Sequence, residues 1–186
     1  MAAALPVTGD PEADLLLEAE PLALLIGMLL DQQVPMEWAF HAPYDLKQRL
    51  GGNLSAADIA ARDPDDLGEV FKAKPALHRF PGSMAKRVHE LCRQLVAEYD
   101  GQAERVWTEA KGGDDLKARI RKLPGFGEDK TRIFIAVLAK RFGVKPPGWE
   151  GHAADWASVA DIDSADAVAR VREAKRAMKA TKKTSN

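Results

Sequence analysis

Hydrophobic residues along this chain recur at intervals of three and four residues, the spacing of one face of an α-helix. No stretch alternates between apolar and polar residues with the period of two that a half-buried strand requires. The clearest stripe lies in residues 83–99 and consists of Val88, Leu91, Cys92, Leu95 and Val96. This pattern predicts an all-α fold in which Cys92 is a core thiol.

Glycine and proline residues mark where we expect the helices to begin and end. Pro21 starts a helix that runs to about Gln33, and Pro35 starts a second one that ends at residues 51–52. Two helices therefore meet at residues 32–34. Further helices are expected near 55–58, 64–72, 83–99, 114–122, 128–142, 153–159 and 165–178, with loops over 73–81 and 144–151 and a frayed tail over 180–186.

Short polar residues indicate three helix starts. Ser55 and Asp58 form a variant of the capping box, and the pair Asp63-Pro64 begins the next helix. Either Asp114 or Asp115 is expected to cap the helix over 114–122.

The segment Leu123-Pro124-Gly125-Phe126-Gly127 joins two basic helices. Its glycines permit positive φ and close approach of a ligand, while free N–H groups of the turn and of the next helix start point outward together. Such amides at the positive end of a helix dipole suit a phosphate oxygen. The alternative is a hairpin whose glycines serve packing only, and the complete motif between basic helices favours the phosphate site.

This hairpin, with Lys130-Thr131 after it and Phe142-Gly143 at the helix end, resembles that of the HhH-GPD, or endonuclease III-like, DNA glycosylases. The stretch 29–34 (LLDQQV) is similar to the "ILGQQ" segment of the alkyladenine-glycosylase branch. A weaker likeness covers 80–88, which includes Lys86. Together the likenesses extend over about residues 20–155.

The resemblance implies one all-α domain over 1–186, built from two helical lobes with a pocket between them for a flipped nucleotide. The helix-hairpin-helix covers about 114–143, and a basic C-terminal helix and tail cover about 163–186. Gln33 enters the gap left by the extruded base, and Gln32 supports it. The other expected DNA contacts are Gly125, Phe126, Gly127, Lys130, Thr131, Arg132, Lys74 and Arg79. The alternatives are a polar helix-end pair and solvated side chains.

The family places a catalytic aspartate in a V-D-T-H segment, which this chain lacks. An ungapped match from Phe142-Gly143 puts Glu150 in the place of the aspartate and His152 in that of the histidine. Asp155 is the other acid within reach. A carboxylate there stabilises positive charge on the sugar in the transition state. The alternative is that Glu150 is a surface-loop residue.

Lyase-competent members carry a lysine two residues beyond the second hairpin glycine, where it forms a Schiff base. That position holds Asp129 here, and Lys130 follows about 100° further around the helix. This spacing favours a monofunctional glycosylase. A one-residue insertion in the turn would bring Lys130 into register, so lyase activity stays open.

Trp38, His41 and Tyr44 recur after Gln33 at intervals of three residues and are the candidate base pocket. The alternative is that these rings are core residues. Nothing in the chain identifies the lesion.

Charge is distributed unevenly despite the formal net charge of −1. Residues 1–46 contain eight acids and no lysine or arginine, which leaves 27 basic against 20 acidic side chains, a net charge of +7, for residues 47–186. The DNA-facing surface is therefore expected after residue 47, with Gln32 and Gln33 as the contribution of the acidic segment.

The single cysteine excludes an internal disulfide and an iron–sulfur cluster held by this chain alone, and fits a reducing compartment. The apolar run 21–30 is too short to span a bilayer. We expect a cytoplasmic, nucleoid-associated monomer without a membrane partner. Its partner would be double-stranded DNA with a lesion or abasic site. No cofactor is expected apart from a structural monovalent cation, Na⁺ or K⁺, at the hairpin, which the resemblance implies.

Three functions fit these observations. The first is a base-excision DNA glycosylase that is monofunctional and uses Glu150. The second is a catalytically inactive protein on the same scaffold that binds damaged or abasic DNA, and the third is an all-α module whose hairpin contacts protein.

Overall fold

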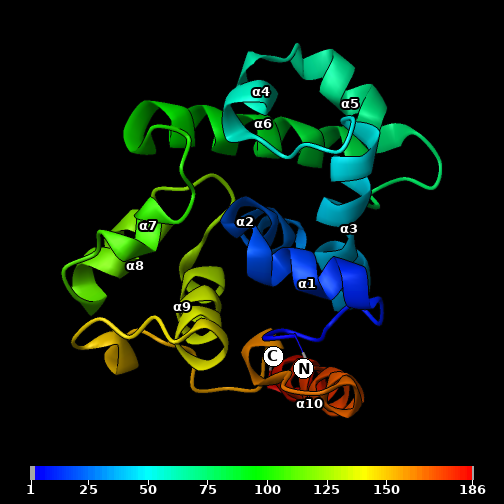
Figure 1. The fold of residues 1–186 in the computed structure, drawn as a ribbon. Helices are drawn as coiled ribbons and strands as arrows, with labels where there is room; N and C mark the ends of the chain where they lie inside the picture. Colours follow the sequence, from blue (N-terminus) through cyan, green and yellow to red (C-terminus); the bar gives the residue numbers. More distant parts are fainter. Residues whose placement is uncertain (1–2, 186) are drawn as a thin grey trace.

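A computed structural model describes residues 3–185, and this part of the chain is helical throughout and contains no strand (Figure 1). The α-helices are α1 (Pro11–Ala19), α2 (Pro21–Leu30), α3 (Met36–Arg49), α4 (Ala56–Ala61), α5 (Pro64–Lys72), α6 (Pro81–Tyr99), α7 (Arg105–Thr108), α8 (Gly113–Arg121), α9 (Glu128–Phe142) and α10 (Ala165–Thr184). Two short 3₁₀ helices are η1 (Trp149–Gly151) and η2 (Val159–Asp161). The all-α prediction is confirmed.

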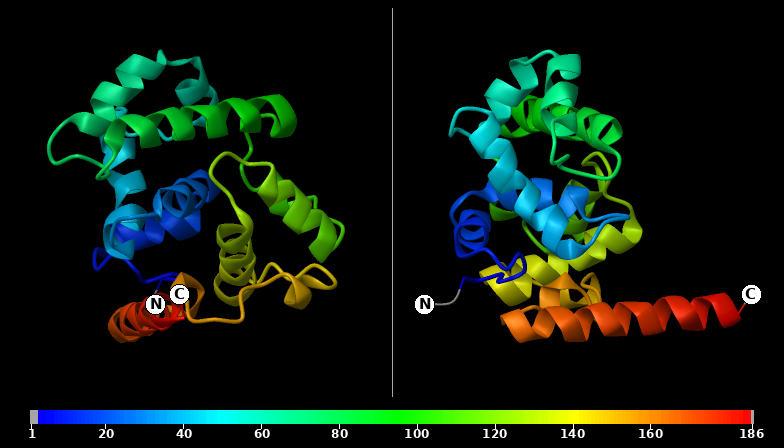
Figure 2. Two further views of the ribbon diagram at one scale, coloured as in Figure 1. Left: turned by 180° about the vertical axis from the view of Figure 1, so that it is seen from behind. Right: turned by 90° about the vertical axis from the view of Figure 1, so that its right-hand side faces the viewer.

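Helix α2 lies at the centre of the arrangement. Every residue from Leu22 to Leu30 is buried, as expected for a helix that is apolar on all sides. It packs on α1 and α3, and α6 lies above it with α4 and α5 on the opposite side of α6 (Figures 1 and 2). A Cβ atom at Gly27 would lie 2.7 Å from Cδ1 of Phe40, so glycine permits the close crossing of α2 and α3.

The remaining helices form a second group. Helices α7, α8 and α9 follow one another on the other side of α2, and η2 packs on both α9 and α10 (Figure 1). The buried apolar residues of both groups form one continuous core, and Cys92 belongs to it as expected. Burial raises the pKa of the Cys92 thiol to about 12.

Several helix limits differ from the prediction. Helix α2 ends at Leu30 because residues 31–35 form a tight loop in which Gln33 has φ of 59°. The expected helix over 153–159 is wrong: this segment runs irregularly back to α9, where the Ala154 N–H donates to the carbonyl of Arg132 at 2.9 Å. Helices α1 and α7 were not anticipated, and α10 continues past residue 178 to Thr184.

Two of the three predicted helix starts carry a side-chain cap. Ser55 Oγ accepts from the Asp58 N–H at 3.2 Å, and the Asp63 carboxylate accepts from the next two free N–H groups. The cap at Asp114 or Asp115 is wrong, because α8 begins one residue earlier, after Gly112, and both aspartates lie in its first turn.

The hairpin between α8 and α9 packs against the last turn of α2. Gly125 has φ of 79°, and a Cβ atom there would lie 2.4 Å from Cδ1 of Leu29. A residue with a side chain would therefore be strained in its backbone and would collide with the core. Gly143, at the end of α9, also has a positive φ, of 71°, but has open space around it.

Gly125 and Gly143 provide a matched test of how tightly the hairpin packs against α2. We expect Gly143→Ala to lower the free energy of unfolding by about 1–2 kcal/mol, the cost of the left-handed backbone alone. Gly125→Ala should cost about 2–5 kcal/mol, because overpacking against Leu29 adds to that strain. Urea unfolding of both variants checks this, and equal destabilisation would show that the hairpin does not press on α2.

Candidate nucleic-acid interface and active site

The loop over residues 31–35, called here the Gln33 loop, connects α2 to α3 and carries an exposed glutamine at its tip. His78 is fully buried and is hydrogen-bonded to this loop. The His78 Nδ1 atom accepts from the Phe80 N–H at 3.0 Å, which assigns the proton to Nε2. The Nε2–H group then donates to the carbonyls of Leu30 and Gln32, each at 3.1 Å. His78 thus holds the backbone directly before the left-handed residue Gln33.

Gln32 points inward and supports the same loop. Its amide Nε2 donates to the Leu29 carbonyl at 3.3 Å, and its Oε1 accepts from Arg87 at 3.3 Å. The two glutamines therefore differ in accessibility: Gln32 is hydrogen-bonded to α2 and α6, whereas Gln33 is exposed.

Lys130 connects the hairpin helix to the end of α2. Its Nζ donates to the Leu29 carbonyl at 2.8 Å and lies 6.0 Å from the centre of the Phe126 ring. Burial lowers the pKa of Lys130 to about 8, and the charge of Arg87 acts in the same direction while that of Asp31 opposes it. The amine is thus a cation at the negative end of the α2 dipole, where a cation is stabilised.

Asp31 is the residue at the C-terminal cap of α2, directly before the two glutamines. Burial raises the pKa of this carboxyl above its ordinary value, and the charges of Lys175 and Lys130 oppose the shift. No group within residues 3–185 donates a hydrogen bond to the carboxylate. A carboxylate at the negative end of a helix is unfavourable, so the stability of α2 does not account for this residue.

Two hollows share Asp31, Lys175 and Lys179. One has a volume of about 490 Å³ and is also lined by the Gln33 loop. The other, of about 160 Å³, reaches inward to Ile133, Trp156, Ala157, Ser158, Val159, Met178 and Lys182. The guanidinium of Arg132 lies over the Trp156 ring at 4.9 Å and so fixes one wall of the inner hollow. Asp31 is the acid that these two spaces have in common.

Glu150 lies elsewhere. It is exposed on η1, which packs on the N-terminal end of α8. There the Gly113 N–H donates to the Pro147 carbonyl at 2.8 Å, and His152 pairs with Asp114 at 2.6 Å. The hairpin leaves the opposite end of α8, about 13 Å away along its axis. The structure therefore does not bring Glu150 or His152 together with Gln33.

Asp155 lies closer to the hairpin than Glu150 does. The neighbouring residues are joined to the first half of α9 by two hydrogen bonds, Ala154 N–H to the Arg132 carbonyl and Arg132 Nη2 to the Ala153 carbonyl at 3.1 Å. Asp155 itself is exposed and does not line the hollows beside Asp31.

The three rings proposed as a base pocket do not converge. Both ring nitrogens of His41 contact carboxylates, of Asp10 at 3.1 Å and Asp45 at 3.0 Å, and the Tyr44 hydroxyl donates to Glu12 at 2.6 Å. These two rings therefore face α1. Trp38 lies about 60° from His41 and about 120° from Tyr44 around α3, and it contacts a different segment. Its Nε1–H donates to the Ala76 carbonyl at 3.2 Å, beside His78.

The predicted contacts of the hairpin and the loop over 73–81 divide by exposure. Gly125, Gly127, Lys74 and Arg79 are exposed. Thr131 is fully buried, so its side chain is not at the surface of this structure. The Phe126 ring packs in the core against Phe134, at 5.8 Å between ring centres, which leaves only its backbone near the surface.

The candidate-site residues that sequence reasoning did not name are Asp31, His78 and Trp156, whereas Lys175 and Lys179 belong to the basic C-terminal helix that it predicted. Of the unnamed residues, only Asp31 had a signal in the chain, because it replaces the glycine of the family's "ILGQQ" segment. The others come to the site from distant segments and have no motif of their own.

The all-α architecture and the glycine hairpin between α8 and α9 define a helix-hairpin-helix protein. A family model described as HhH-GPD superfamily base excision DNA repair protein matches residues 26–186, so the chain belongs to this superfamily. The search of curated proteins and the search of solved structures returned no match. Membership confirms the family resemblance and implies that DNA is the substrate. Among the described residues, no helix is long and apolar enough to cross a membrane.

His78 gives the Gln33 loop a defined pH dependence. Burial lowers the pKa of His78 below its ordinary value of 6.5, so the unfolded chain binds the proton more readily than the folded one. The stability gained from neutral His78 is fully present above pH 6.5 and is lost as the pH falls below it.

We expect His78→Gln to cost about 1–3 kcal/mol at neutral pH, because a buried carbonyl or the Phe80 N–H is left without its partner. The variant should also lose part of the wild type's decline in unfolding free energy between neutral and acid pH, measured by urea unfolding across that range. His89→Gln is the control that should keep the decline. If His78→Gln and the wild type decline equally, neutral His78 does not hold the loop.

Proposed function

We propose that this chain is a DNA glycosylase that cleaves the N-glycosidic bond of a damaged or mismatched base. Membership of the superfamily supports this, and the observation that carries it is the placement of an exposed Gln33 at the rim of a hollow lined by the Asp31 carboxylate, which has no ion-pair partner among residues 3–185. A base extruded beside Gln33 would place its sugar next to that carboxylate.

The hairpin would hold the DNA backbone. The N–H groups of Gly125, Gly127 and Glu128 donate no hydrogen bond within the described chain, and they lie at the positive end of α9. They suit a phosphate oxygen and read no base sequence.

The hairpin carbonyls fit the expected monovalent cation. Those of Lys122, Gly125 and Phe126 accept no backbone hydrogen bond in residues 3–185, and carbonyl oxygens are the ligands that hard cations prefer. These three residues would hold Na⁺ or K⁺, which would add positive charge beside the phosphate.

In the reaction, the bond between C1′ and the base nitrogen breaks and its electron pair leaves with the base. The Asp31 carboxylate would stabilise the positive charge that develops on the sugar. A water molecule adds to C1′ and loses a proton, and the departing base takes up one proton, so that the products are the sugar hydroxyl and the neutral base. Asp31 takes the role expected of Glu150, because Asp31 lines the hollow and Glu150 does not.

We further propose that the enzyme is monofunctional. Asp129 is exposed in the first turn of α9, and the Lys130 amine is held by the Leu29 carbonyl. Lys130 would keep Asp31 ionised through its charge and would not attack the sugar. Water is then the nucleophile.

The test uses duplexes with alkylated, deaminated or mismatched bases, each sample being split between mild alkali and no treatment. We expect strand breaks only after alkali. Asp31→Asn should lower the rate of base release about 100-fold or more, whereas Glu150→Gln should leave it unchanged. Because Asp31→Asn removes a negative charge near the phosphates, it should bind the same duplexes at least as tightly as the wild type.

The pH profile provides a second reading of the same experiment. Because the pKa of Asp31 is raised above 3.8, the rate should decline with falling pH at a midpoint above that value, and this decline should be absent in Asp31→Asn. Breaks without alkali would show that Lys130 acts as a nucleophile. Tight binding without release on every duplex would instead support the non-enzymatic DNA-binding function.

A further inference from the structure

Helix α10 buries few of its residues against the rest of the protein, so packing alone does not account for its length. It spans 20 residues, about 30 Å, yet only Ala167 and Val171 are buried. Figure 2 shows its C-terminal half projecting beyond the other helices. A helix that is polar on most sides gains little from burial, so a surface role has to account for the projecting half.

The cations of α10 are not spread evenly around it. Lys175, Lys179 and Lys182 follow one another at steps of four and three residues, which places them on one face. Lys175 and Lys179 line the 490 Å³ hollow with the Gln33 loop, and all three lysines line the inner hollow with Asp31. We call these three residues the α10 lysine row.

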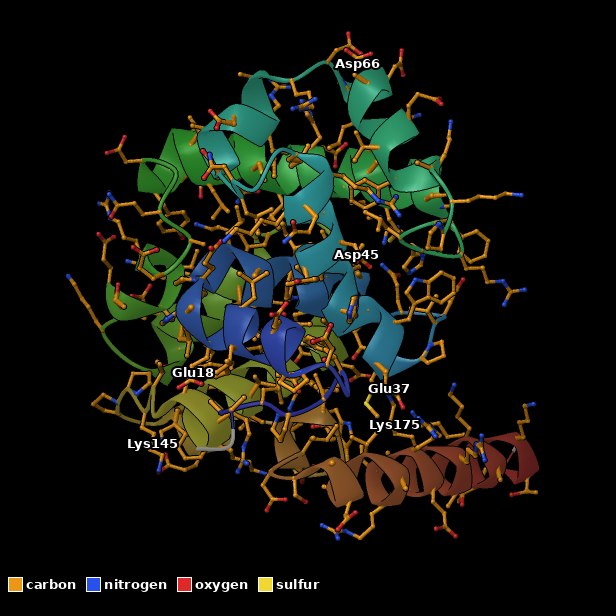
Figure 3. All side chains as sticks on the ribbon, turned by 45° about the vertical axis from the view of Figure 1, so that its right-hand side comes forward. Glu18, Glu37, Asp45, Asp66, Lys145 and Lys175 are labelled. Carbon is orange, nitrogen blue, oxygen red and sulfur yellow. The ribbon has the colours of Figure 1, made fainter. Side chains whose placement is uncertain are left out.

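The α10 lysine row retains its charge for a ligand. Its neighbour Arg172 pairs with Glu37 of α3, and this pair fastens α10 to the body of the protein. Figure 3 shows Lys175 on the same side, near Glu37. None of the three lysines forms an ion pair within the described residues.

Positive groups lie on both sides of Gln33. On one side, a hollow of about 190 Å³ is lined by Gln33, His78, Phe80 and Arg87. On the other side are Lys175 and Lys179. A DNA strand that passes over Gln33 would thus contact a cation on each side of the extruded nucleotide.

We propose that the α10 lysine row is a second phosphate-binding surface, which holds the DNA backbone beside Gln33 independently of the hairpin. This rests on the proposed function. The row spans about 10 Å along the helix, which corresponds to about three phosphates of one strand at 3.4 Å of rise each. Lysine side chains act on phosphates as point charges and read no base identity, so the row serves any sequence around a lesion.

The experiment measures duplex affinity as a function of salt concentration, with an undamaged duplex and one that contains a non-cleavable abasic analogue. The variant carries Lys175→Gln, Lys179→Gln and Lys182→Gln. The control carries three neutralisations of exposed cations that line neither hollow, Arg62→Gln, Lys145→Gln and Arg170→Gln. Both variants have the same net charge.

For the row variant, we expect the slope of log affinity against log salt concentration to fall by about 3, one for each phosphate that the row no longer neutralises. Affinity should weaken by the same factor on both duplexes, and the control should keep the wild-type slope. Thermal unfolding of both variants shows whether they are folded. An unchanged slope in the row variant overturns this proposal alone, whereas a wild type without salt-dependent affinity overturns the proposed function as well.

Discussion

The last turn of a buried helix leaves carbonyl groups without helical partners, and this constraint at the end of α2 organises the site. Water cannot reach a turn that is buried on all sides, so other segments must supply the donors. Lys130 of α9 donates to Leu29, and His78 of the loop before α6 donates to Leu30. Three segments separated by tens of residues are thus brought to one point. The Gln33 loop connects this point to α3.

The C-terminal end of α2 also determines the electrostatic environment of Asp31. Asp31 follows the buried turn directly and is held where the helix dipole and burial both oppose its charge. The charges of Lys130 and Lys175 oppose that effect, and neither lysine comes within ion-pair distance of the carboxylate in the described structure. A carboxylate stabilised at a distance and left without a donor is suited to a charge that develops in a substrate.

Much of the fold could be read from the chain, because local rules set it. The three- and four-residue spacing of apolar residues located α6, and Gly125 and Gly127 located the hairpin. The family could be recognised for the same reason, since its motifs are short and contiguous. Helix α7 was missed because four residues carry too little periodicity to detect.

The site could be read only in part. The Gln33 loop and the hairpin were located from their motifs, whereas Glu150 was placed by counting from Gly143. The structure does not bring Glu150 to the Gln33 loop, because residues 144–152 first cross to the far end of α8 and the chain returns to α9 only at Ala154. His78 could not be found at all, because its importance lies in carbonyls 46 and 48 residues away.

The net charge of −1 conceals a separation between an acidic N-terminal segment and a basic remainder, and the structure shows which groups the acids contact. Acids of the first 46 residues are engaged within the protein: Asp10 and Asp45 bracket His41, Glu12 holds Tyr44, and Glu20 pairs with Lys47. These contacts partly compensate their negative charge on the side of the molecule formed by α1 and α3. Glu37 acts differently, since its pairing with Arg172 anchors a basic helix beside Gln33. An acid of the N-terminal segment therefore helps to hold positive charge at the site, and a whole-chain sum is a poor guide to what a protein of this kind binds.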